Sequence, residues 1–302
     1  MENTNKEKLK LITAMVLFGT IGIFVKHIDL PSSVIAFARA FIGMLFLLAV
    51  IVCKRMKISK EAIRKNLVPL LFSGVFLGMN WIGLFEAYRY TSVATATLCY
   101  YLAPIIVILV APILFKEKLT LRKGICAVVA LVGMVFVSGV IKNGMPAAGE
   151  LKGILYGLGA AVLYAIIMLL NKKIQNISAY DKTVVQLGIS TVVLLPYCLM
   201  TENISTFAFS PMVIGLLLLV GIVHTGVTYY LYFGAIGALK SQTVAIISYL
   251  DPVVAVLISV FILREGMDVF GIIGAVLILG AALFSELEKK KPYEETNHQK
   301  SL

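Results

Sequence analysis

One carboxylic acid lies within an otherwise apolar stretch of the sequence. Asp251 belongs to the run "YLDPVVAVLISVFILREGM", residues 249–267, in which it directly precedes Pro252. If this run crosses a bilayer, a carboxylate near its centre costs at least a few kcal/mol, roughly 2.5–3.5 on insertion scales. We therefore expect Asp251 to face the interior of a helix bundle, where it exchanges a proton or binds the amine of a ligand. The alternative is a structural hydrogen bond to a neighbouring helix.

Aromatic side chains with a few polar neighbours form a second group. Tyrosine and tryptophan are common at membrane interfaces, but Tyr101 and Tyr249 lie near the middle of their apolar runs. Aromatic walls with few polar groups are typical of small-molecule pockets. We therefore predict a central substrate cavity with the candidate residues Asn80, Trp81, Tyr101, His224, Tyr229, Tyr249 and Asp251. For each aromatic residue, core packing is the alternative, and His224 is either a titrating group or a buried core histidine.

Three other charged residues lie in or beside apolar runs. Glu86 and Arg89 are three residues apart, a spacing that places two helical side chains on one face. They predict an ion pair near the outer end of their helix, with an external gate or a substrate contact as the alternative. Arg39 lies about two turns inside another run, so it must pair with a polar group or reach the interface. We expect Arg39 to have a structural role.

Two prolines occupy the middle of apolar runs. Pro104 and Pro252 each remove a backbone hydrogen bond and free a carbonyl group about one turn earlier. We predict a helix kink at each. Such a kink either shapes a cavity, where irregular backbone is tolerated in a membrane, or helps the helices to pack.

The sequence lacks the residue groups of an enzyme or of a metal site. Its three histidines, His27, His224 and His298, are not spaced to share a metal ion. The four cysteines stand singly, and the glycines within apolar runs form no phosphate-binding motif. We therefore expect a protein that is not an enzyme and that needs no metal, cofactor or ATP.

The composition indicates the elements that position these residues. Of 302 residues, 60% are hydrophobic and 14% are charged, with a mean hydropathy of +0.95, whereas soluble proteins carry about 25% charged residues. Apolar runs long enough to cross a bilayer recur along the whole chain. We predict an all-α polytopic membrane protein with ten transmembrane helices. They lie near residues 9–28, 32–53, 66–88, 92–115, 122–141, 151–172, 182–201, 211–237, 241–263 and 268–286.

The distribution of Lys and Arg predicts the orientation. If the N-terminus is cytoplasmic, twenty-one of these residues fall on the inner side and five on the outer side, in agreement with the positive-inside rule. The net charge of +11 therefore reflects membrane orientation rather than nucleic-acid binding. The first run is predicted to be an uncleaved signal-anchor, and residues 288–302 a polar cytoplasmic tail. The predicted location is the cell membrane, with both termini in the cytoplasm.

The chain contains an internal repeat. At a shift of 148 residues, "YLAPIIVILVAPILFKEKL" (residues 101–119) aligns with the run that contains Asp251, so that Ala103 is equivalent to Asp251. Other equivalent pairs, some at shifts of 146–147, are Phe18 and Tyr164, Lys26 and Lys172, Arg39 and Gln186, Gly78 and Gly226, Trp81 and Tyr229, Tyr101 and Tyr249, Pro104 and Pro252, and Glu117 and Glu265. We predict two five-helix copies, residues 1–146 and 147–287. Because five is odd, the second copy enters the membrane from the opposite side. Glu117 and Glu265, at helix ends, are expected to be architectural.

The stretch "FEAYRYTSVATATLCYYLAPIIVILVAPILFKEKLTLRKG", together with its inverted second copy, resembles the drug/metabolite transporter superfamily, specifically its EamA-type ten-helix members. The resemblance extends from Leu9 to Ser285. It implies an architecture of two inverted repeats and the export of amino acids, other metabolites or drugs. The sequence departs from the family pattern at Glu86, where the family has an aromatic or apolar residue.

These observations predict a secondary active transporter that exports small metabolites, such as amino acids or amphipathic drug-like compounds, by alternating access. Protons are a candidate coupling ion. The expected partners are the lipid bilayer and a small-molecule substrate, and the chain is expected to be a monomer or a dimer. A passive channel or facilitator for a small polar metabolite is the alternative, because inverted repeats also occur in pores.

Overall fold

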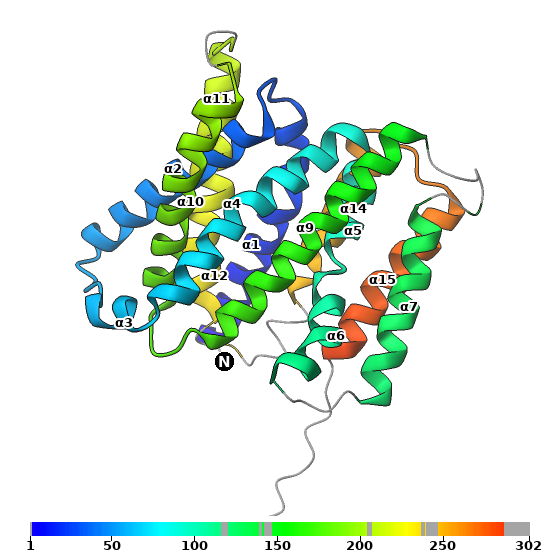
Figure 1. Ribbon diagram of the computed structural model, residues 1–302, viewed down its shortest axis with the longest axis horizontal. Coiled ribbons are helices and arrows are strands. Elements are labelled where there is room, and N and C mark those ends of the chain that lie inside the picture. Colours follow the sequence, from blue (N-terminus) through cyan, green and yellow to red (C-terminus); the bar gives the residue numbers. More distant parts are fainter. Residues whose placement is uncertain are drawn as a thin grey trace, which may run out of the picture.

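The described part of the chain is built from helices alone (Figure 1). The structure is a computed structural model that describes residues 2–115, 120–138, 141, 147–203, 207–236, 239 and 247–286. Its helices are α1 (Glu2–Lys26), α2 (Ser32–Cys53), α3 (Lys60–Lys65), α4 (Leu67–Tyr90), α5 (Val93–Tyr100), α6 (Ala103–Phe115), α7 (Leu121–Val137), α9 (Ala148–Lys173), α10 (Ala179–Thr201), α11 (Pro211–Gly221), η2 (Ile222–Val227), α12 (Thr228–Ile236), α14 (Leu250–Leu257), η3 (Ile258–Ile262) and α15 (Val269–Glu286). The elements η2 and η3 are π-helices.

Within the described residues, the helices follow the ten predicted spans. Seven described segments are long and apolar enough to cross a membrane, and three shorter apolar helices cover Gly124–Val137, Leu250–Ile262 and Val269–Phe284. The predicted span 32–53 coincides with α2. The all-α polytopic fold is therefore confirmed. Glu117, Lys240 and the predicted tail lie outside the described residues.

The short helix α3 was not predicted, because it lies in a charged connection between two spans. The Ser59 side chain accepts the N–H of Ala62 at 3.3 Å and so caps its first turn. Glu61 lies in the first turn, and Arg64 and Lys65 lie in the last. These positions suit the helix dipole, which favours acidic groups at the start and basic groups at the end.

The packing of the helices displays the duplication. By the repeat, α1 is equivalent to α9, α2 to α10, α4 to α11–α12, α6 to α14, and α7 to α15. Helix α4 packs against α9, and in the same way α12 packs against α1. Helix α4 also packs against α10, as α11 and η2 pack against α2. Two further large interfaces join equivalent helices directly, α2 with α10 and α7 with α15. The core therefore lies between two copies of one arrangement.

Equivalent helices α7 and α15 lie side by side and run in opposite directions (Figure 1). At one end of the pair, an Nη atom of Arg122 donates to the carbonyl oxygen of Phe284. At the other end, the rings of Phe136 and Phe270 lie 6.0 Å apart between centroids. Residue numbers thus rise along one helix while they fall along the other. This is the relation expected for two halves that enter the membrane from opposite sides.

Both predicted kinks are places where a helix begins. Helix α5 ends at Tyr100 and α6 begins at Ala103, so Pro104 lies in the first turn of α6. Pro252 likewise lies in the first turn of α14, which follows a turn at Tyr249. The first N–H groups of a helix have no partner within it, so the missing N–H of proline removes no helical hydrogen bond there. Each proline therefore lies in the first turn of a helical segment, directly after an interruption of the described span, and the predicted kinks stay a prediction.

Candidate functional site

A cavity of about 410 Å³ lies at the junction of the two copies. Its wall contains both members of five equivalent pairs. They are Phe18 and Tyr164, Trp81 and Tyr229, Leu84 and Tyr232, Tyr100 and Ser248, and Tyr101 and Tyr249. The cavity therefore lies on the pseudo-two-fold axis that relates the copies, where inverted-repeat transporters bind their substrates. Its volume falls within the range of small-molecule pockets, about 300–1,000 Å³.

Arg39 and Asp251 are the two residues with formally charged side chains among the described residues that line the cavity; the wall is otherwise largely aromatic and aliphatic. Asp251 lies in the first turn of α14. The hydroxyl of Tyr101 donates to Oδ2 of Asp251 at 2.5 Å. Tyr101 stands at the break between α5 and α6, so the broken spans of the two copies meet at this hydrogen bond. Ala103, the equivalent of Asp251, is fully buried.

Arg39 lies on the cavity wall, a position that sequence reasoning did not assign to it. Helix α2 carries it, and its side chain is 5% exposed. Nε donates to Oγ1 of Thr225 at 2.9 Å, and the guanidinium carbon lies 4.1 Å from the centroid of the Trp81 ring. A cation within about 6 Å of an aromatic face is attracted to it. The signal for this residue was present in the sequence, since a lone arginine inside an apolar span is by default a functional candidate.

The π-helix η2 positions the partner of Arg39. Thr225 donates to the carbonyl of Val220, five residues earlier, at 3.1 Å. Helix α2 approaches closely here, because a Cβ on Gly221 would lie 2.5 Å from Cβ of Ile42 and one on Gly226 would lie 2.5 Å from the Phe46 ring. Single-turn π segments are frequent at functional sites. The π-helical turn of η2 thus places the hydroxyl group of Thr225 against Arg39 of α2.

The remaining predicted cavity residues divide into two groups. Trp81, Tyr229 and Tyr249 line the cavity together with Tyr101, Asp251 and Pro104. Asn80 and His224 are not among the described residues that line the cavity. The polar atoms of both side chains form hydrogen bonds to neighbouring helices instead. Nδ2 of Asn80 donates to the carbonyl of Ala160 at 2.6 Å, and Nε2 of His224 lies 2.9 Å from Oγ1 of Thr20. Asn80 and His224 therefore support the wall from behind.

A second cavity, of about 520 Å³, opens near the end of the bundle at which α1 ends and α5 begins. Tyr88 lines both cavities and is 4% exposed, so its ring lies between them. Arg89 also lines this second cavity, and its Nη1 lies 3.4 Å from Oε1 of Glu86. The predicted Glu86–Arg89 contact is thus present in the structure, and Arg89 belongs to the wall of the second cavity.

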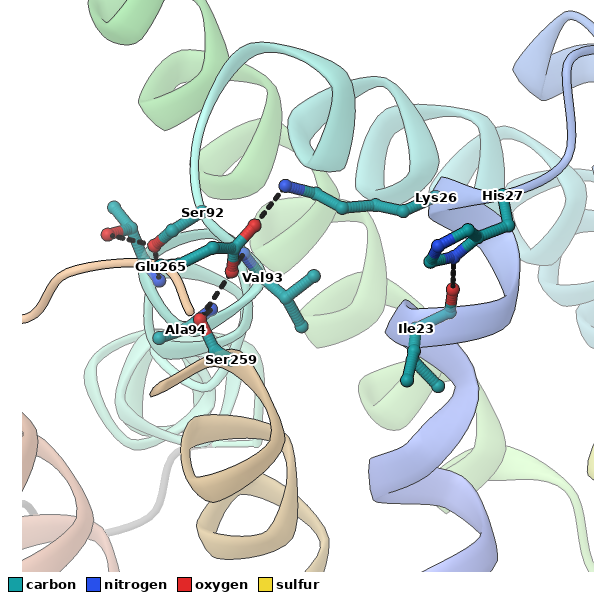
Figure 2. A network of polar contacts seen from close by, with 9 residues as sticks. Ile23, Lys26, His27, Ser92, Val93, Ala94, Ser259 and Glu265 are labelled. Atoms are coloured by element: carbon teal, nitrogen blue, oxygen red, sulfur yellow. Dashed lines mark hydrogen bonds and ion pairs between the residues drawn. The ribbon is translucent and has the colours of Figure 1, made fainter. Parts of the chain in front are cut away.

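A polar network joins several helices beside this second cavity (Figure 2). Nζ of Lys26, at the end of α1, donates to Oε1 of Glu265. Oε2 of Glu265 accepts the N–H of Val93 at 2.8 Å and the hydroxyl of Ser259, and Oγ of Ser259 accepts the N–H of Ala94 at 3.1 Å. The carboxylate therefore lies at the N-terminus of α5, where a helix dipole favours negative charge. We call these five residues the Glu265 network.

The Glu265 network joins three parts of the chain that are far apart in sequence. It connects the end of α1, the start of α5, and the segment formed by η3 and the turn that follows it, whereas the sequence indicated only an architectural glutamate at a helix end. As for metals, the described residues contain no group of three or more His, Cys, Asp or Glu side chains placed to hold an ion.

Comparisons with known proteins agree with a duplicated membrane fold. Residues 6–139 and 151–286 match the model of the EamA-like transporter family. The uncharacterized transporter YxxF of Bacillus subtilis (strain 168) is 32% identical over 281 residues, covering 91% of this chain and 88% of that protein. An uncharacterized transporter of Archaeoglobus fulgidus is 27% identical over 276 residues, covering 91% and 94%. Protein PecM of Dickeya dadantii is 27% identical over 251 residues, covering 77% and 82%. A solved crystal structure with 18% identity has the same fold, with a TM-score of 0.66 over 93% of this chain and 98% of the other.

Proposed function

We propose that this multi-pass membrane transporter, which belongs to the EamA-like transporter family, is a secondary active exporter of a small amphipathic metabolite that works by alternating access. The observation that carries the proposal is the position of the cavity. It lies where equivalent residues of two oppositely directed copies meet, as in Trp81 and Tyr229. If each copy adopts the conformation of the other, a state that is open to one side of the membrane becomes a state that is open to the opposite side.

The Glu265 network and Tyr88 support a closed state at one end of the bundle. We propose that this end faces outward and that both termini are cytoplasmic, in agreement with the charge distribution. Substrate in the central cavity would leave through the second cavity once Tyr88 moves and the Lys26–Glu265 pair separates. The Lys26 and Glu265 side chains are 26% and 14% exposed, so water can reach both charges when they separate. Such a pair can therefore hold one state without preventing the change to the other.

The wall of the central cavity supports an amphipathic substrate. Its aromatic rings offer a large apolar contact surface, and Asp251 offers a carboxyl group for an amine or a proton. If the amine and the proton compete for Asp251, binding of one releases the other. The substrate and the proton would then each shift the equilibrium between the inward-open and the outward-open state, because each binds one of these states more tightly than the other. This competition would couple export to a proton gradient.

Transport by purified protein in proteoliposomes tests the proposal. A thermal-shift screen against a metabolite library first identifies a compound that binds. We expect that compound to show saturable counterflow, and we expect its net movement to respond to an imposed pH gradient. Flux that rises linearly with concentration, shows no counterflow and ignores the pH gradient would instead identify a passive channel.

A further inference from the structure

We propose that Arg39 binds a carboxylate of the transported molecule and that, together with Asp251, it selects substrates that carry one carboxylate and one amino group. This inference rests on the proposed function, because it names the substrate class of the same cavity. It assigns a specificity-determining role to a residue for which the sequence indicated only a structural one.

The first argument is the incomplete set of partners around Arg39. A guanidinium group has five N–H donors, and among the described residues only Nε has an acceptor, Oγ1 of Thr225. No described carboxylate lies within 4.0 Å of Arg39, so the ring of Trp81 provides its main remaining compensation. An arginine held inside a membrane without an anion is costly. Its two Nη groups form the planar fork that suits a carboxylate, and the residue lies on the cavity wall.

The second argument is charge balance within the cavity. Arg39 and Asp251 contribute one charge of each sign, and the other described lining residues are formally uncharged. A dianion such as a phosphate ester would leave excess negative charge beside Asp251, and a simple amine would leave Arg39 uncompensated. A zwitterion satisfies both groups. Of the Asp251 oxygens, Oδ2 is taken by Tyr101, while no described residue donates to Oδ1, which is therefore available for an ammonium group.

The third argument comes from the repeat. Gln186 is equivalent to Arg39, is buried, and bonds between helices, because its Nε2 donates to Ser73 at 2.7 Å and to Asn171 at 2.8 Å. A neutral amide therefore suffices for packing at this position of the fold. The equivalent of Asp251 is likewise the neutral residue Ala103. Both charges are thus additions to the shared architecture, and both line the same cavity.

Binding to a matched series of probes tests the inference. The probes are L-phenylalanine, L-phenylalaninamide, phenethylamine and 3-phenylpropionate, with a second series built on L-leucine. Dissociation constants are measured by titration calorimetry on the purified full-length protein. In the wild type we expect the amino acid to bind about ten- to a hundredfold more tightly than its amide in at least one series, as for a hydrogen bond to a charged group. Arg39→Gln is expected to bring this ratio close to one.

Two further variants make the result specific. Asp251→Asn is expected to keep the preference for the carboxylate and to lose the preference of the amino acid over 3-phenylpropionate. The control Arg64→Gln changes an exposed arginine on α3 and is expected to keep both preferences. If Arg39→Gln does not fold, Arg39→Lys and Thr225→Val replace it, and each is expected to lower the amide ratio several-fold.

Two results would overturn the inference. One is a wild-type protein that binds the amides or the amines as well as the amino acids in both series. The other is an unchanged ratio in folded Arg39 and Thr225 variants. In either case, saturable counterflow of some other compound in proteoliposomes would leave the proposed function standing. Failure of counterflow with every compound that binds would instead contradict the proposed function.

Discussion

Tyr101 of the first copy donates a hydrogen bond of 2.5 Å to Asp251 of the second copy. The two residues are 150 positions apart in sequence. Tyr101 lies three residues before Pro104 and Asp251 directly before Pro252, and each proline lies in the first turn of a helix. The contact joins the two broken spans at the cavity wall. A change in the charge of Asp251 or in its partner therefore acts on both halves of the transporter at once.

The first prediction concerns proton coupling at Asp251. Asp251→Asn keeps the size of the side chain but removes its titration, so we expect counterflow to lose its dependence on pH and to fall by about tenfold or more. Tyr101→Phe removes only the hydrogen bond, so it should change the rate and leave the pH dependence present. Both are measured as counterflow rates at a series of pH values. An unchanged rate with an unchanged pH profile in Asp251→Asn would show that the carboxyl group is structural.

The second prediction concerns the Glu265 network. Glu265→Gln weakens the contact with Lys26 and the hold on α5, so we expect the central cavity to be reached more often through the second cavity. Thr97 lines the central cavity, so Thr97→Cys, in a protein without its native cysteines, reports on this access. Its labelling by a membrane-impermeant maleimide should be several-fold faster in Glu265→Gln. Glu61→Gln, which breaks an exposed pair with Lys65, is the control; equal acceleration in both variants would rule out a specific role of the network.

The third prediction concerns close packing between helices. A Cβ on Gly226 would lie 2.5 Å from the Phe46 ring, whereas one on Gly78 would lie 3.0 Å from the end of the Leu194 side chain. Overpacking costs about 1–3 kcal/mol, so Gly226→Ala should lower the melting temperature in detergent more than Gly78→Ala does. Gly159→Ala meets nothing within 4 Å and should be neutral or stabilising. The same order would hold, more strongly, for leucine substitutions; a wild-type melting temperature in Gly226→Leu would contradict the contact.

The fourth prediction concerns topology. Reporter fusions at Asn143 and Asn203 should give an external signal, and fusions at Lys57 and Lys240 a cytoplasmic one, because the second copy is inverted. An alkaline phosphatase and green fluorescent protein pair reads both sides. An external signal at Lys240 would remove the basis for the inverted orientation.

More of the fold than of the candidate site could be predicted from the sequence. Hydrophobic runs and the repeat depend on local composition and spacing, so the predicted span 32–53 coincides with α2. The break at Tyr101 and the π-helix η2 depend on how neighbouring helices pack, for instance on the approach of Ile42 to Gly221. That information is absent from the hydropathy of either segment. The placement of Pro104 shows this limit, because a helix start and a kink have the same sequence signal.

The residues that line the candidate cavity could be predicted in part. The aromatic pairs and Asp251 were identified by their depth in apolar runs and by the repeat, and the structure places them around one cavity. Asn80 and His224 have the same depth and polarity, but their bonds to Ala160 and Thr20 hold them between helices. The contact between Lys26 and Glu265 spans 239 residues of sequence. Neither residue alone indicates its partner.

Locking the Glu265 network tests alternating access most directly. Cysteines replace Lys26 and Glu265 in a protein without its native cysteines, and a short cleavable thiol cross-linker joins them. Counterflow of a bound compound is then measured before and after cleavage of the linker. We predict that the cross-linked protein still binds the compound, which reaches the cavity from the opposite side of the membrane. Counterflow should stop in the cross-linked protein, and cleavage of the linker should restore counterflow. Undiminished counterflow in the fully cross-linked protein would contradict alternating access through this end of the bundle.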